Sequence, residues 1–291
     1  MEIKFGPAGN SESFYKQGFK HTYQMPAWLH GMGLDAFEYS FGRGVRIKDE
    51  TAQAIRKQAE HYGIQLSVHA PYFINLANPQ PDALQKNIAY FRETSHAAFM
   101  MGAKRVVFHP GSCKGMERTK AFALCKERFV QVLHEMDRLG FGEKLVYCPE
   151  TMGKVNQLGS LEEVLALCTL DERVVPAIDF AHLHARGFGA IRSAADYAHI
   201  LQAVIDALGE KRARGLHIHF CRIEYSKGGE KMHHRFEDAM FGPEPEPLMQ
   251  LIAKLDLLPV VICESNGTMA EDAKALQQYY LKHSAYIHDK K

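Results

Sequence analysis

Side chains that can bind a metal ion stand at the ends of six short apolar segments of this chain. The segments 66–69, 106–109, 145–150, 175–179, 216–219 and 260–264 each end in a histidine, an aspartate or a glutamate. These residues are His69, His109, Glu150, Asp179, His217 or His219, and Glu264, and His182 follows three positions after Asp179. Imidazole and carboxylate ligands without thiolates suit zinc, manganese or iron. One such ending is more often structural, but six together predict a shared metal site.

These side chains are too many for a single ion. Three or four protein ligands hold one ion, so the set predicts two or three ions close together. Clustered ions activate a water molecule and stabilise the entering and leaving oxygens of a displacement at phosphorus. Glu150 and Glu264 are also candidates for a catalytic acid and base.

The surrounding pattern predicts which elements position these residues. Apolar runs and 3.6-residue periodicity alternate along the chain. Strands are expected over residues 3–5, 34–39, 64–69, 105–109, 144–150, 174–179, 214–219 and 259–264. Helices are expected over residues 48–62, 82–101, 118–139, 193–208, 247–255 and 269–283, with another that begins at the capping box of Ser160 and Glu163.

Eight strand-then-helix units predict an α/β fold, a single (β/α)8 TIM barrel over residues 1–291. The metal site is then expected at the C-terminal face of the strands, where such barrels carry their chemistry. Residues 220–246 show little regular patterning and predict a long loop over the site. The tail 289–291 is expected to be frayed.

Composition narrows the class of protein. The 291 residues carry a net charge of +1, which indicates no particular partner. The six cysteines form no C-x-x-C pair, and no signal-peptide core or membrane-length apolar run is present in the sequence. We therefore expect a cytoplasmic monomer with no membrane partner.

Four motifs at the strand ends resemble one known family. They are His69-Ala70-Pro71-Tyr72-Phe73-Ile74-Asn75-Leu76-Ala77, Phe108-His109-Pro110-Gly111-Ser112, Pro149-Glu150-Thr151-Met152-Gly153 and Ile178-Asp179-Phe180-Ala181-His182. Together they resemble the endonuclease IV family of apurinic/apyrimidinic endonucleases, which belongs to the xylose-isomerase-like barrels. The likeness runs from about Phe5 to about Thr268.

The resemblance implies three Zn2+ ions, although Mn2+ or Fe2+ would suit the same ligands. Glu150 would bridge two ions. His69 and His109 would complete the first site, Asp179, a strand-seven histidine and Glu264 the second, and His182 with an Asp-x-His pair of the long loop the third. The enzyme would hydrolyse the DNA backbone 5′ to an abasic site by metal-activated hydroxide. Tyr72 and Phe73 match positions that the family inserts into the duplex.

The sequence departs from the family at three places. His217 and His219 both point inward by period-2 alternation, and we favour His219 as the ligand. The loop offers His233 or His234, and aligning His233 puts Lys231 where an aspartate is expected. Glu230 is the candidate substitute, and Lys231 could instead contact phosphate. Arg43 lies in a poorly matching segment, where it either contacts phosphate or is solvated.

Three functional interpretations follow. The first is a metal-dependent phosphodiesterase that acts on DNA with an abasic site. The second is a sugar isomerase or epimerase with one divalent ion on Glu150, Asp179, a strand-seven histidine and Glu264. The third is a barrel that holds metal without catalysis. We favour the phosphodiesterase because His69, His109 and His182 have no clear role in an isomerase with a single ion.

Overall fold

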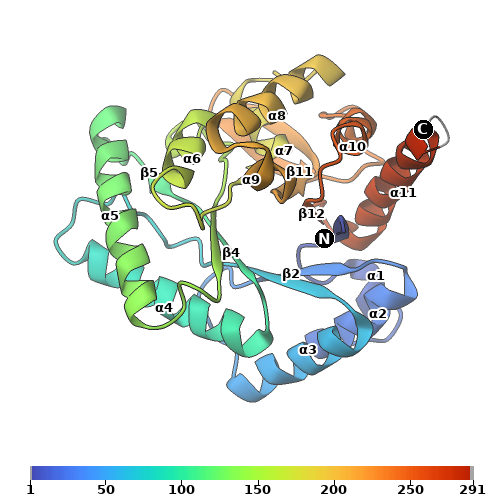
Figure 1. The fold of residues 1–291 in the computed structure, drawn as a ribbon, viewed down its shortest axis with the longest axis horizontal. Helices are drawn as coiled ribbons and strands as arrows, with labels where there is room; N and C mark the ends of the chain where they lie inside the picture. Colours follow the sequence, from blue (N-terminus) through green and yellow to red (C-terminus); the bar gives the residue numbers. More distant parts are fainter. Residues whose placement is uncertain (1, 289–291) are drawn as a thin grey trace.

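Eight parallel strands form the centre of the fold in the described residues, and helices surround them (Figure 1). In this computed structural model, residues 2–288 are described, and the tail 289–291 that we expected to be frayed lies outside them. The barrel strands are β1 Lys4–Pro7, β2 Ala36–Ser40, β3 Gln65–His69, β4 Arg105–Phe108, β6 Val146–Pro149, β8 Ala177–Asp179, β9 His217–Phe220 and β12 Val260–Cys263.

The strands pair as two four-stranded sheets that close on each other. Their orders are β1-β12-β9-β8 and β2-β3-β4-β6, and all pairs within them are parallel. Parallel bridges between Ala8 and Glu38 and between Glu150 and Ala177 join the sheets at both seams. The predicted (β/α)8 barrel is confirmed, and the carboxyl ends of its strands meet at one end of the molecule.

One seam depends on a glycine. A Cβ at Gly6 of β1 would lie 1.8 Å from the backbone oxygen of Ala36 in β2. No side chain fits that space, so glycine lets the first strand approach the second closely enough to close the barrel.

Helices follow every barrel strand. The long ones are α3 Asp49–Tyr62, α4 Ala83–Met101, α5 Arg118–Arg138, α6 Leu161–Cys168, α8 Ala194–Leu208, α10 Pro245–Lys254 and α11 Met269–His288. Their bounds lie within a few residues of the predicted ones, except for α11, which runs five residues further. Shorter helices that we did not predict are α1 Glu12–Lys16, η1 Thr22–Gln24, α2 Met25–Gly31, α7 Phe180–Arg186 and α9 Glu210–Arg214. None of the described helices combines the length and apolar character needed to cross a membrane.

The segment 220–246 differs from the predicted irregular loop, because part of it is a β-hairpin. Strands β10 Arg222–Ser226 and β11 Gly229–His234 pair antiparallel. Gly229 has a φ of +87° and leaves no room for a Cβ beside the backbone of Gly153. The hairpin is mostly polar, so it lacks the apolar alternation by which strands are recognised in a sequence. A second small pair joins β5 Gly111–Ser112 to β7 Gln157–Leu158.

Candidate metal centre

The predicted side chains gather at the carboxyl end of the barrel, where they border a cavity of about 730 Å³. The parallel arrangement explains this, since every strand delivers its last residue to the same end. The cavity is lined by His69, His109, Glu150, His182, Glu230, His233 and Glu264, while Asp179, His217 and His219 are fully buried and do not line it. Three groups of nitrogen and oxygen atoms at this end could each hold an ion.

The first group contains His69, His109 and Glu150. Nε2 of His69 lies 3.0 Å and Nε2 of His109 3.1 Å from Oε2 of Glu150. Nδ1 of His69 donates to the backbone oxygen of Ala70 at 2.8 Å, which leaves the lone pair on Nε2. The ring is thus held in the tautomer that a metal ligand at Nε2 requires.

The second group contains Glu150, Asp179, His219 and Glu264. Nδ1 of His219 lies 3.0 Å from Oε1 of Glu150 and 3.4 Å from Glu264. Glu150 therefore faces the first group with one oxygen and the second group with the other. Asp179 is fully buried, and its Oδ2 has no hydrogen-bond partner among the described residues. A buried carboxylate oxygen without a hydrogen bond fits a cation ligand.

The third group contains His182, Glu230 and His233. Nε2 of His182 lies 3.6 Å from Glu230 and 3.4 Å from Nε2 of His233. Nδ1 of His182 donates to the backbone oxygen of Thr151 at 2.9 Å, so its Nε2 is free to bind a cation. The hairpin supplies Glu230 and His233, and α7 supplies His182.

The remaining loop candidates lie outside these groups. Lys231 forms an ion pair of 2.6 Å with Glu224, on the outer side of the hairpin. The ring of His234 stacks on Phe241, and its Nδ1 lies 3.3 Å from Asp238. The position expected for an aspartate thus carries an outward lysine, and the carboxylate comes from the residue before it.

The carboxylates differ in their readiness to ionise. Burial opposes ionisation of Glu150, but His219, His109 and His69 around it hold the pKa of its carboxyl well below its usual range. Burial raises the pKa of the Glu264 carboxyl, and the nearby charge of Glu150 adds to the rise. Two neighbouring acids with opposite shifts are a typical arrangement for acid and base chemistry.

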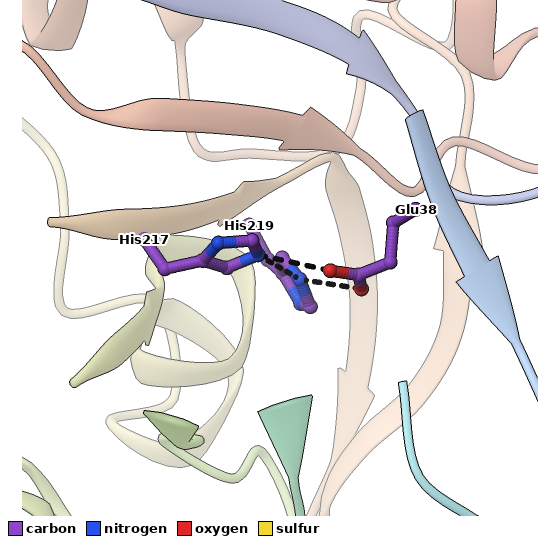
Figure 2. Close-up of side chains that lie close together, drawn as sticks. All are labelled: Glu38, His217 and His219. Carbon is purple, nitrogen blue, oxygen red and sulfur yellow. Dashed lines mark hydrogen bonds and ion pairs between the residues drawn. The ribbon is translucent and has the colours of Figure 1, made fainter. Parts of the chain in front are cut away.

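The buried histidines also differ in the direction in which their pKa is shifted. Burial works against a proton on His182, yet Asp179 and Glu150 raise its pKa to about 9. Burial lowers the pKa of His217 to about 4, so that ring is neutral near pH 7. His217 lies outside the three groups at the cavity and contacts Glu38 at 3.0 Å (Figure 2).

Glu38 is the residue that sequence reasoning missed. It is fully buried and belongs with His217 and His219 to a fourth group of possible ligand atoms (Figure 2). The sequence does mark Glu38 as unusual. Its carboxylate lies within an apolar strand, on the inward face that it shares with Ala36 and Ser40. Its partners stand 179 and 181 positions later in the chain, beyond the reach of a local pattern.

The candidate substrate-contacting residues are exposed, and Tyr72 lines the cavity. Tyr72 is 57% exposed and stacks on His109, with ring centroids 5.5 Å apart. Phe73 is 54% exposed, and Arg43 is exposed as well. Tyr72 can therefore reach a molecule that sits over the cavity.

The sequence matches a family description over most of its length. The model of the xylose isomerase-like TIM barrel family matches residues 26–282. The chain belongs to this family. An uncharacterised protein of Methanocaldococcus jannaschii is 31% identical over 252 residues, which cover 87% of this chain and 89% of that protein.

Other relatives of this protein are named after an enzyme activity. The probable endonuclease 4 of Acholeplasma laidlawii is 31% identical over 204 residues, which cover 67% of this chain and 65% of that protein. The family likeness expected from the strand-end motifs is confirmed by these relatives.

Several solved structures share the fold of this protein. Endonuclease IV from Thermus thermophilus superimposes with a TM-score of 0.72 at 19% identity, over 96% of this chain and 99% of that one. D-Psicose 3-epimerase from Clostridium cellulolyticum gives a TM-score of 0.64 at 14% identity, over 98% and 99% of the two chains. Proteins named as nucleases and proteins named as epimerases thus share this barrel.

Proposed function

We propose that this protein is a metal-dependent phosphodiesterase that resembles endonuclease IV and hydrolyses the DNA backbone 5′ to abasic sites. The observation that carries the proposal is the third donor group, His182, Glu230 and His233, beside the two groups that share Glu150. A reaction that moves a proton on a sugar needs one ion, whereas a displacement at phosphorus makes use of several. The relatives named probable endonuclease 4 support the same choice.

The donor set fits zinc, because it consists of imidazole nitrogens and carboxylate oxygens, and it would also accept Mn2+ or Fe2+. His69, His109 and Glu150 would hold the first ion. Glu150, Asp179, His219 and Glu264 would hold the second, and His182, Glu230 and His233 the third. When bound, such ions activate water and offset the negative charge of a phosphate.

The chain's own residues would orient the substrate and move protons. Glu264 borders the cavity and has a raised pKa, which suits a carboxyl that takes up and returns a proton. Tyr72 and Phe73 would enter the base stack beside the damaged nucleotide. Arg43 would meet the DNA backbone, while Lys231 would do so only by leaving Glu224. We also propose that residues 1–291 form a single domain that acts as a monomer.

A sugar isomerase or epimerase is the second candidate. The group of Glu150, Asp179, His219 and Glu264 is by itself sufficient for one ion, and Glu150 and Glu264 then flank it as an acid and base pair. The epimerases among the structural neighbours favour this alternative.

The test is a nicking assay on a DNA duplex that carries one abasic site. Purified protein is stripped with a chelator, reloaded with Zn2+ or Mn2+, and incubated with the abasic duplex and with an undamaged duplex of the same sequence. The proposal expects a metal-dependent cut 5′ to the abasic site and no cut in the control. Absence of nicking, together with metal-dependent epimerisation of a ketose, would reject it in favour of the second candidate.

A further inference from the structure

Glu38 makes a contact across the interior of the barrel. It lies on β2, and its partners His217 and His219 lie on β9, with β1 and β12 between these two strands in the sheet order (Figure 2). Oε2 of Glu38 is 3.0 Å from Nε2 of His217, and Oε1 is 2.9 Å from Nε2 of His219. All three side chains have no exposed surface.

The carboxylate meets three polar groups that can donate a hydrogen. Besides the two rings, Oγ of Ser67 donates to Oε2 at 2.7 Å. No group in the described part of the chain meets the full geometry of a hydrogen bond to Oε1, and Nε2 of His219, at 2.9 Å, is the donor that lies beside it. Nε2 of His219 also lies 3.1 Å from Nε2 of His217, and because the carboxylate only accepts, its two oxygens favour a hydrogen on each of these nitrogens. A buried carboxylate needs such donors, because burial without them is costly.

Three of the other candidate imidazole ligands show a common arrangement. His69 and His182 turn Nδ1 to the backbone oxygens of Ala70 and Thr151, and Nδ1 of His233 lies 3.2 Å from the backbone oxygen of Glu264. Each of these rings is anchored through one nitrogen and offers the other to its donor group. In His219 the two nitrogens exchange these roles. Nε2 faces the anchor Glu38, and Nδ1 faces Glu150 and Glu264 of the donor group.

We propose that Glu38 is a positioning residue that holds the Nε2 hydrogen of His219 and thereby aims the Nδ1 lone pair at the second donor group. This inference rests on the proposed metal centre. An anchoring carboxylate also makes the imidazole a stronger ligand than a backbone carbonyl does. The anchor of His219 is a carboxylate with no exposed surface, and its donor group is the one that contains three carboxylates, Glu150, Asp179 and Glu264.

An additional ion among Glu38, His217 and His219 is the competing explanation of the same contacts. Nδ1 of His219 already faces the second group, so a second ion on Nε2 would require the ring to lose both of its hydrogens. The hydrogen-bonded arrangement needs no such step, because one ring nitrogen keeps its hydrogen and the other binds the ion.

The test compares the affinities of Zn2+ for the wild-type protein and the Glu38→Gln variant. Bound ions are counted by elemental analysis, and dissociation constants are measured by competition with a chromophoric chelator. Glu38→Gln keeps the shape of the side chain but removes its charge and one acceptor. We expect one dissociation constant to rise about 10-fold to 100-fold, as for other outer partners of metal ligands, with the remaining ones unchanged.

Two controls separate the explanations. His217→Leu removes the 3.1 Å contact between the Nε2 atoms of His217 and His219 but leaves Glu38 beside His219, and it is expected to change every affinity less than Glu38→Gln does. Glu163→Gln alters a carboxylate in α6, away from the centre, and is expected to leave all affinities unchanged. Thermal unfolding of the metal-free proteins checks that each variant folds, and Glu38→Asp replaces Glu38→Gln if the latter does not fold, with an intermediate loss expected.

Three other results of the zinc-binding experiment would contradict the positioning role of Glu38 or the proposed function. Unchanged affinities in Glu38→Gln reject the positioning role while the metal centre stands. An ion bound in addition to those of the three donor groups, and lost in both Glu38→Gln and His217→Leu, means that an ion sits among Glu38, His217 and His219, which also overturns it. A wild-type protein that binds no ion rejects the proposed function itself.

Discussion

Glu230 lies 3.6 Å from Nε2 of His182, although the two residues are 48 positions apart in the chain. The hairpin of β10 and β11 creates this relationship by turning Glu230 towards the cavity and Lys231 towards Glu224 on the outside. The family resemblance expects an aspartate two positions before His233, where this chain has Lys231. The longer glutamate side chain, one position earlier, brings a carboxylate to the same group.

Replacing Glu230 is therefore expected to remove one ion. In the Glu230→Gln variant, the affinity of the third group should fall by about 100-fold or more, because loss of a direct ligand exceeds the loss of an outer partner. Elemental analysis should then find one ion fewer than in the wild type. Lys231→Ala is the matched control and should keep the full number. An unchanged ion count in Glu230→Gln would show that the third group does not hold a metal.

Glu150 is expected to be the most sensitive residue of the centre. Its two oxygens face two different donor groups, so Glu150→Gln weakens both at once. We expect nicking of an abasic duplex to fall by roughly 1,000-fold or more, beyond the loss from a single stabilising donor. Rates are compared with those of the chelated wild-type protein. A Glu150→Gln protein with near-normal activity of either kind would show that the reaction takes place elsewhere.

The strand-end residues could be predicted from the sequence because one rule of topology places them. Parallel strands bring their carboxyl ends together, so His69, Glu150 and Asp179 converge once the eight units are recognised. The pairing of Glu38 with His219 could not be predicted in this way. Inward alternation identifies Glu38 as unusual, but only the closed barrel shows which side chain faces it.

The hairpin marks a second limit of prediction. Glu230 and His233 were candidates because of their residue types, but their positions depend on a turn that closes on Gly229 and on contact with Gly153. The strands of the hairpin are short and polar, so a single sequence gives them no periodic signal. The choice of Glu230 over Lys231 as the inward residue follows from that geometry.

Tyr72 and Phe73 are expected to contribute to DNA binding rather than to stability. Both are more than half exposed, and Tyr72 lines the cavity. Stacking on a base contributes about 1–3 kcal/mol, so each alanine variant should bind an abasic duplex roughly 5-fold to 150-fold more weakly. Fluorescence anisotropy with labelled duplex in chelator measures this. Leu281→Ala, at an equally exposed site on α11, is the control, and equal affinities for all proteins would contradict the wedge role.

Glu163 is expected to stabilise the fold in a pH-dependent manner. Its Oε2 accepts hydrogen bonds from the backbone nitrogens of Gly159 and Ser160 at 2.7 and 3.0 Å and from Arg118 at 2.7 Å. Burial opposes its ionisation, but Arg118 and the two backbone groups hold the pKa of the carboxyl below its usual value. The charged form is therefore favoured in the folded state, and this stabilisation is present above the unfolded pKa and lost as pH falls through the folded pKa.

In urea unfolding of the metal-free protein near pH 7, Glu163→Gln should lower the free energy of unfolding by about 1–2 kcal/mol, since a helix cap and a charged hydrogen bond are weakened. As pH falls below the usual range of a glutamate carboxyl and the wild-type carboxyl takes up a proton, the difference should shrink. Glu172→Gln, at an exposed position, should differ little from the wild type at either pH. A difference between Glu163→Gln and the wild type that stays constant with pH would assign the loss to the shape of the side chain and not to its charge.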